Sequence, residues 1–268
     1  MRVQRVILGV GLVAALLAGA VIGVRALIGQ VASSGPSCTL GQGQSAVDLD
    51  PEQAADAATI AAVAKTRGLP DHAVTIAFAA ALQESKLYNL AYGDRDSLGV
   101  FQQRPSEGWG TPAQLINPAY AAGAFFAHLA RVAGWQTLPI AIAAQRVQHS
   151  ADGSAYAQWE DEARALARAL TGEITAGLTC KYSDHRVPKS LVLTTAATTE
   201  LGGSWSSGGV SVARDWTVAE WLVAHSYAYG IVRVEVRGSV WDNHSGRWHA
   251  DAGGSIAPTY RLAPLPPG

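Results

Sequence analysis

A series of alanines at helical spacing, ending at a single acid, places the strongest constraint on how this chain folds. The residues three, four, seven and eleven positions before Glu84 are Ala81, Ala80, Ala77 and Ala73. Positions with this spacing share one face of an α-helix. The pattern therefore predicts a helix over about residues 70–86, with a small apolar face that Glu84 continues.

Glu84 lies in the last turn of this predicted helix, where two effects favour a protonated carboxyl group. Solvation is poor beside the alanines, and the negative end of the helix dipole is close. A carboxyl group that keeps its proton near neutral pH is what a general acid requires. We therefore interpret Glu84 as a candidate catalytic acid, in preference to a surface glutamate at a fraying helix end.

The residues after Glu84 carry a resemblance to a known family. Residues 84–85, Glu-Ser, followed by residues 99–102, Gly-Val-Phe-Gln, resemble the Glu-Ser and Gly-Leu-Met-Gln signatures of lytic transglycosylases in the lysozyme-like superfamily. The run from 84 to 103 is similar to membrane-anchored, lysozyme-like proteins of actinobacteria. The resemblance covers about residues 50–170, and its most specific part is the spacing from Glu to Gly-X-X-Gln.

A third motif of the family departs from its usual sequence here. In the transglycosylases it reads Ala-Tyr-Asn-Ala-Gly and lines the cleft, and a later tyrosine completes the site. The matching stretch is residues 146–150, where Gln148 replaces the asparagine, followed by Tyr156. Gln145 fills the same role if the alignment slips by one turn. Around Glu84, the resemblance thus implies a substrate site drawn from Ser85, Gln102, Gln103, Gln145, Gln148 and Tyr156.

The resemblance also implies a reaction that needs only one protein carboxyl group. Glycosidases usually use two, but in lytic transglycosylases one Glu protonates the glycosidic oxygen and later accepts the proton of the muramyl 6-hydroxyl, which closes a 1,6-anhydro ring. Glu84 is the candidate for this role. Asp94 or Asp96 is a possible second carboxylate that positions water, which would give a hydrolytic muramidase. Aspartates in such a Gly-Asp-Arg-Asp turn more often cap the loop.

The N-terminal part of the chain is predicted to be a membrane anchor. Residues 6–24 contain no charged residue, and arginines bracket them on both sides. About 20 apolar residues cross a bilayer as a helix, whereas the core of a signal peptide is nearer 7–15 residues. We expect residues 1–28 to be a cytoplasmic tip and an uncleaved signal anchor that contacts the lipid bilayer through residues 6–28. A cleaved signal peptide is the alternative, and in both cases the remainder is exported.

Two cysteines flank the lysozyme-like region. Cys38 lies in residues 29–47, a segment rich in Gly, Ser and Gln that we interpret as a linker. Cys180 follows the last helix of the lysozyme-like domain, expected over residues 48–180. Outside the cytoplasm, the two are predicted to form a disulfide that ties the ends of the domain together, with two free thiols as the alternative.

Residues 181–268 are predicted to form a small α+β module with a flexible loop and tail. Residues 191–196 are expected to form a strand, and a capping box at Thr217 opens a helix. Valines alternate with charged residues over 231–237, and residues 241–248 read as a hairpin partner. The expected fold is a mainly α, lysozyme-like (α+β) domain with this small C-terminal α+β module, preceded by one transmembrane helix.

Two functions are compatible with these patterns. The first is a single-pass membrane enzyme, with its N-terminus in the cytoplasm, that cleaves the MurNAc-GlcNAc β-1,4 bond in glycan strands of peptidoglycan. The second is a non-catalytic lysozyme-like module that binds glycan or acts as a scaffold in the cell envelope. A formal net charge of −1 provides no basic field for nucleic acid. No metal-binding or phosphate-binding motif is present, so neither a metal ion nor a cofactor is expected.

Overall fold

The computed structural model describes residues 35–41, 46–149, 154–183 and 186–265, and the described residues from Pro36 onward form one compact unit. The predicted membrane anchor, residues 6–24, lies outside these ranges. Within them, no helix combines the length and the apolar character that a bilayer crossing needs.

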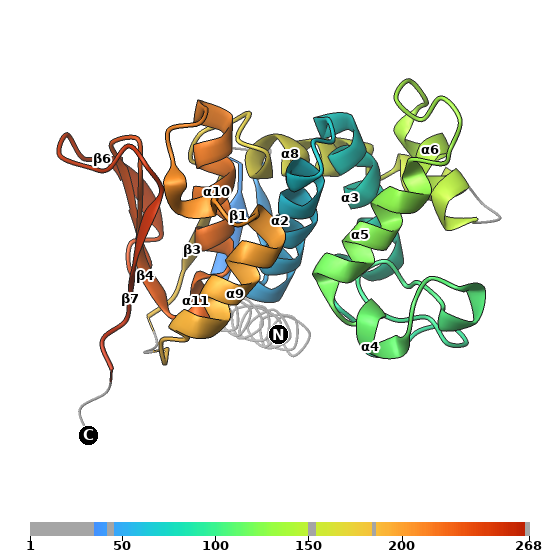
Figure 1. Cartoon of the computed structure of the whole chain (residues 1–268), viewed down its shortest axis with the longest axis horizontal. Helices are drawn as coiled ribbons and strands as arrows, with labels where there is room; N and C mark the ends of the chain where they lie inside the picture. Colours follow the sequence, from blue (N-terminus) through green and yellow to red (C-terminus); the bar gives the residue numbers. More distant parts are fainter. Residues whose placement is uncertain (1–34, 42–45, 150–153, 184–185, 266–268) are drawn as a thin grey trace, which may run out of the picture. The chain divides into compact units, whose positions relative to one another are not determined.

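Most of the helices gather around α3 (Asp71–Ser85), the helix that carries Glu84 (Figure 1). α3 packs against α2, α6 and α8, and α2 also contacts α5. The other elements of this region are α2 (Pro51–Thr66), the 3-10 helix η2 (Pro105–Glu107), α4 (Pro112–Leu115), α5 (Pro118–Leu129), α6 (Ile140–Gln148), α7 (Ser154–Ala157) and α8 (Glu160–Leu170). The alanines of α2 and α3 are nearly all buried, which lets these helices approach closely.

The start of α2 and the end of α3 are fastened to each other by one side chain. Gln53 accepts a hydrogen bond from the main-chain N–H of Asp50 (2.8 Å), the cap residue of α2. The amide of Gln53 in turn donates to the main-chain oxygen of Lys86 (2.8 Å). Lys86 is the residue at which α3 ends, and it has a left-handed backbone conformation. Asp50 and Pro51 thus begin α2, and Gln53 links that helix start to the end of α3.

A first sheet joins the two ends of this helical region. Its strands are β1 (Ser37–Leu40), β2 (Val47–Leu49) and β3 (Leu178–Lys181), in the antiparallel order β2-β1-β3. Cys38 lies directly opposite Cys180 in this sheet, and the two form a disulfide. The predicted disulfide is confirmed, but residues 37–40 of the expected linker are the central strand of a sheet.

The segment after β3 differs from the expectation at two places. Residues 191–196, predicted to be a strand, belong to helix α9 (Ser190–Leu201). Leu193, Ala197 and Leu201 are buried at four-residue spacing, and α9 packs against α2, so burial outweighs the local β preference of its Val and Thr residues. The next helix, α10 (Val212–Ala224), begins before Thr217 because Ser211 caps it.

A second antiparallel sheet completes the fold. Its order is β6-β5-β4-β7, which confirms the predicted strand near 231–237 and its hairpin. The strands are β4 (Ile231–Val236), β5 (Ser239–Asp242), β6 (Arg247–Ala250) and β7 (Thr259–Leu262), and α10 leads to β4 through α11 (Ser226–Tyr229). The 3-10 helix η3 (Trp205–Ser207) precedes α10.

Helix α10 connects the second sheet to the rest of the molecule. It contacts β4 on one side and β3 and α2 on the other. The buried carboxyl group of Glu220 accepts hydrogen bonds from the main-chain N–H groups of Gly177 (2.7 Å) and Leu178 (3.1 Å) at the start of β3. The residues after Cys180 therefore share a hydrophobic core with the helical region.

The fold class expected from the sequence is wrong. The structure is an α+β fold with helices and two small sheets, in place of a mainly α, lysozyme-like domain with an appended module. The first sheet was missed because its strands are three or four residues long, and because β1 lies in a segment with linker composition. Their hydrogen bonds depend on β3, which is far away in the sequence.

Candidate functional site

The carboxyl group of Glu84 is half-buried in the last turn of α3. The hydroxyl group of Tyr156, on α7, donates a hydrogen bond to Glu84 Oε1 (2.8 Å), and the side chain of Gln148 also hydrogen-bonds to Glu84. Burial raises the pKa of Glu84, while these two hydrogen bonds and the positive charge of Lys86 lower it; burial prevails. The group is therefore inclined to hold a proton, yet has partners that stabilise its charged form.

The partners of Glu84 come from α6 and α7, two neighbouring helices that are far from α3 in the sequence. Gln148 is the last residue of α6, and its amide group also donates to the main-chain oxygen of Phe101 (2.8 Å). Tyr156 lies on the short helix α7, which is separate from α8, and its side chain is buried. The motifs predict that Glu84, Gln148 and Tyr156 share one site, and the structure brings the three into contact.

Ser85 holds the segment after the loop against the end of α3. Its buried hydroxyl group lies 2.7 Å from the main-chain oxygen of Val100 and 3.2 Å from that of Ala81. Val100 and Phe101 are fully buried. The Gly-Val-Phe-Gln segment is thus attached to α3 through Ser85 and to α6 through Gln148. Ser85 therefore has a structural role.

Gln102, the last residue of this segment, and the following Gln103 make contacts away from Glu84. Gln103 is buried and donates to the main-chain oxygen of Ala121 on α5 (3.3 Å), so its amide does not point towards an open groove as the sequence suggested. Gln102 is half-buried and donates to the main-chain oxygens of Tyr92 (3.2 Å) and Gly99 (3.1 Å). Both side chains fasten the loop.

Gln145 lies three residues before Gln148 on α6 and is half-buried. Residues at this spacing share one side of a helix. Gln145 is therefore on the side of α6 that carries Gln148, while Gln148 itself makes the contact with Glu84.

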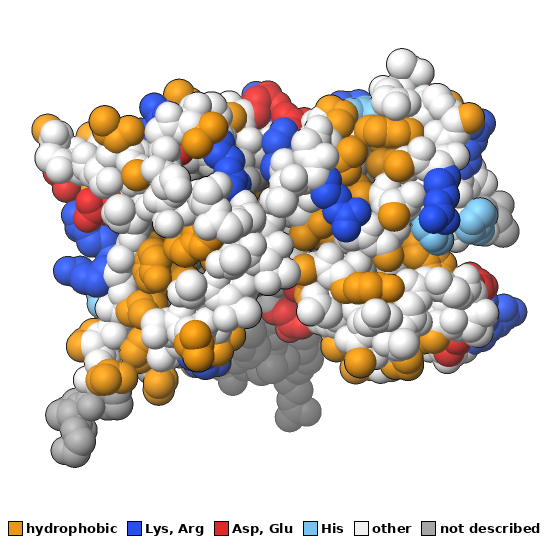
Figure 2. Space-filling view, in the orientation of Figure 1, with side chains coloured by type: hydrophobic (Ala, Val, Ile, Leu, Met, Phe, Trp, Pro, Cys, Tyr) orange, Lys and Arg blue, Asp and Glu red, His pale blue; other side chains and the backbone are white. Residues whose placement is uncertain are grey.

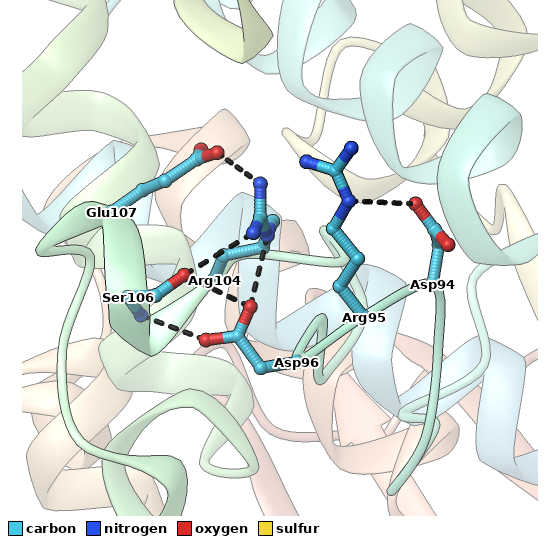
Figure 3. A network of polar contacts seen from close by, with 6 residues as sticks. All are labelled: Asp94, Arg95, Asp96, Arg104, Ser106 and Glu107. Atoms are coloured by element: carbon cyan, nitrogen blue, oxygen red, sulfur yellow. Dashed lines mark hydrogen bonds and ion pairs between the residues drawn. The ribbon is translucent and has the colours of Figure 1, made fainter.

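Asp96 is engaged in the polar network of the loop (Figure 3). Its two carboxylate oxygens accept hydrogen bonds from Arg104 Nε (2.9 Å), the main-chain N–H of Ser106 (2.8 Å) and the hydroxyl group of Ser106 (3.0 Å). These bonds lower the pKa of Asp96 to about 2. The side chain of Asp94 is 93% exposed and lies 4.0 Å from Arg95. Asp96 thus holds the loop, and Asp94 faces solvent.

Lys86 and Trp159 form part of the site that the sequence analysis missed. The ammonium group of Lys86 lies 3.9 Å above the ring of Trp159, and it donates to the main-chain oxygen of Leu82 (3.0 Å). Trp159 is held by a hydrogen bond from its Nε1 to Gln83 Oε1 (2.8 Å). A lysine at a helix C-terminus is common. Lys86 differs from this common case in its left-handed conformation and in the contact of its ammonium group with Trp159, the residue before α8.

Lys86 is shared by two acids. Burial lowers the pKa of Lys86, and the negative charges of Glu162 and Glu84 raise it. Burial also raises the pKa of Glu162, while Lys86 lowers it. The positive charge of Lys86 consequently acts on Glu84 from the side of α8, whereas Tyr156 and Gln148 contact it from α7 and α6.

The described residues contain no group of His, Cys, Asp and Glu side chains arranged to hold a metal ion. Four cavities in the described part of the chain have volumes of about 690, 320, 300 and 410 Å³, and Glu84 lines none of these four.

No protein-family model and no curated protein matches this chain. The resemblance to lytic transglycosylases consequently depends on the motifs at residues 84–85 and 99–102. The function is therefore argued from the site itself.

Proposed function

We propose that this protein cleaves the β-1,4 bond between MurNAc and GlcNAc in peptidoglycan, with Glu84 as its single acid and base. The observation that carries the proposal is the environment of Glu84, a half-buried carboxyl group with a raised pKa and two side-chain hydrogen-bond partners, Tyr156 and Gln148. A general acid needs such a balance between its two protonation states.

The chemistry follows from that balance. Glu84 gives its proton to the glycosidic oxygen as the bond from C1 of MurNAc breaks, and GlcNAc leaves with a free 4-hydroxyl group. Tyr156, Gln148 and Lys86 then stabilise the carboxylate. The MurNAc 6-hydroxyl adds to C1 to close the 1,6-anhydro ring, and its proton returns to Glu84. Water in place of the 6-hydroxyl would give a reducing end and a muramidase.

The proposed location is outside the cytoplasm. The disulfide between Cys38 and Cys180 supports this proposal, because such bonds persist in oxidising compartments and are rare in the cytoplasm. Peptidoglycan is assembled in the same compartment, so the proposed substrate and the disulfide point to the same place.

Digestion of purified sacculi tests this function. The protein is incubated with sacculi beside Glu84→Gln, and the released muropeptides are separated and weighed. Release by the native protein alone, with 1,6-anhydro ends, is the expected result. No release, or equal release by both proteins, would contradict the enzymatic function, and reducing ends would identify a hydrolase.

A second candidate is a non-catalytic glycan-binding or scaffold module of the cell envelope. The observation that favours it is Gln148, which replaces the asparagine of the third motif and whose amide is engaged by Phe101 and Glu84. Co-sedimentation with sacculi separates the two candidates. Binding without release, unchanged in Glu84→Gln, is the result expected of a scaffold.

A further inference from the structure

A second candidate site lies in a hollow between α9 and the α4–α5 junction. Two adjoining cavities, of about 690 and 320 Å³, share Asn117, Ala119, Thr199 and Glu200. In Figure 2 the surface is hollowed between the side that carries α9 and the side that carries α4 and α5. We call these two cavities the α9 hollow; Glu84 and its partners do not line it.

The larger cavity of the α9 hollow is mostly apolar. At its rim, the side chains of Leu191 and Val192 on α9 are 79% and 54% exposed. Its apolar lining residues are Ala113, Ile116, Pro118, Ala119, Leu191, Val192 and Ala196. A volume of about 690 Å³ with this lining is in the range of small-molecule sites.

Among the described residues, Glu200 is the one charged side chain that lines the larger cavity, and it is held from one side. Its Oε2 accepts hydrogen bonds from the hydroxyl group of Thr59 and from Nε1 of Trp221, both at 2.7 Å. Glu200 is only 9% exposed, and no residue in the described part of the chain donates to its Oε1. Because the core engages Oε2, Oε1 is the oxygen available to the cavities. A carboxylate oxygen that faces a cavity accepts hydrogen bonds from the group that occupies the cavity.

The other polar groups of the larger cavity include two hydroxyl groups and the side-chain amide of Asn117, whose Oδ1 accepts from the main-chain N–H of Tyr120 (3.1 Å). The hydroxyl groups of Thr195 and Thr199 donate to main-chain oxygens four residues earlier on α9, which leaves their oxygen lone pairs for a ligand. Tyr229 is half-buried at the cavity and is the last ring of a stack with His225 and Trp221. The face of such a ring attracts a cation. Burial and the negative charge of Glu200 raise the pKa of Tyr229, which keeps its ring neutral.

We propose that the α9 hollow binds a primary ammonium group carried on an apolar body. The ammonium group donates to Oε1 of Glu200 and to the threonine oxygens beside the ring of Tyr229, and the apolar body lies between α9 and the α4–α5 junction. Arg67 lines the smaller cavity, and its charge confines a cation to the larger one. This proposal is independent of Glu84 and of the glycan chemistry.

Titration calorimetry of the full chain with three six-carbon probes tests the ligand class. The probes are n-hexylammonium chloride, 1-hexanol and sodium hexanoate, which share an apolar chain and differ in the head group. We expect hexylammonium to bind at least tenfold more tightly than hexanol, and hexanoate not to bind. Equal affinities for hexylammonium and hexanol, or no binding of hexylammonium, would overturn the proposal.

Three variants locate the site. Glu200→Gln removes the charge and is expected to weaken hexylammonium binding at least tenfold. Ala196→Trp fills the larger cavity and leaves Glu200 in place, and it is expected to abolish hexylammonium binding. This variant tests whether the larger cavity is the binding site even if Glu200→Gln does not fold. Val210→Trp changes an exposed valine outside both cavities and is the matched control. Unchanged binding in Ala196→Trp, or equal losses in Ala196→Trp and Val210→Trp, would refute the assignment.

Discussion

The end of α3 and the junction of α10 with β3 each contain a glutamate whose pKa is raised by burial, and the two glutamates differ in what surrounds them. Glu220 is fully buried, and main-chain N–H groups of Gly177 and Leu178 occupy its oxygens. Glu84 is half-buried, and its partners are the side chains of Tyr156 and Gln148. A raised pKa therefore does not by itself indicate a catalytic acid.

The partners explain the difference. Main-chain donors of a strand are fixed by the sheet, so Glu220 acts as a clamp between α10 and β3, next to the disulfide at Cys180. Glu84 is held by side chains of α6 and α7 and remains partly exposed to solvent. The α10–β3 region is accordingly expected to determine stability, and the α3 end to determine activity.

Glu84→Gln should show most clearly that the end of α3 determines activity and not stability. The variant keeps the shape of the side chain and removes the transferable proton, so release of muropeptides should fall by about 10²–10⁴-fold, the usual contribution of general acid catalysis. The melting temperature should change little, because only a half-buried group is altered. Rates on sacculi and thermal unfolding by circular dichroism measure the two quantities. A large loss of stability with activity retained would reverse the assignment.

Removal of the disulfide should produce the largest loss of stability. Cys38 and Cys180 are separated by 142 residues, and closing a loop of this length restricts the unfolded chain by about 5 kcal/mol in the chain-entropy treatment. The double variant Cys38→Ser, Cys180→Ser should lose about 3–5 kcal/mol of unfolding free energy in urea. The native protein measured with and without reductant is the control. A loss below about 1 kcal/mol would show that β1 and β3 pair equally well without the bond.

Glu220→Gln should lower stability by a smaller amount and leave the chemistry intact. Glutamine keeps one acceptor oxygen, so one of the two main-chain N–H groups of β3 loses its partner, at a cost of about 1–3 kcal/mol. Urea unfolding measures this cost, and the rate per folded molecule on sacculi should equal that of the native protein. Glu235→Gln, on a half-buried strand residue outside this junction, is the matched control.

The same contrast explains what could be predicted from the sequence. The helical spacing of alanines predicted α3, because this signal is local. The motif resemblance predicted that Gln148 and Tyr156 lie near Glu84, because this signal depends on residue type. β1 was missed since a four-residue strand is stabilised by its partner β3 and by the disulfide. The ammonium–ring contact of Lys86 with Trp159 was missed for a similar reason, as it exists only after α3 and α8 have packed together.

The smallest expected effect is a change of pH dependence in Lys86→Met. The positive charge of Lys86 lowers the pKa of Glu84, so its removal should raise that pKa further. A general acid works in its protonated form, and activity falls as the pH rises through its pKa; the alkaline limb of kcat/KM should therefore move to higher pH. The lost ammonium–ring contact is worth about 0.5–1 kcal/mol at an exposed position, so the variant should remain folded. Lys189→Met, an exposed lysine at the start of α9, is the control. A limb that stays in place in Lys86→Met would mean that Tyr156 and Gln148 alone balance the burial of Glu84.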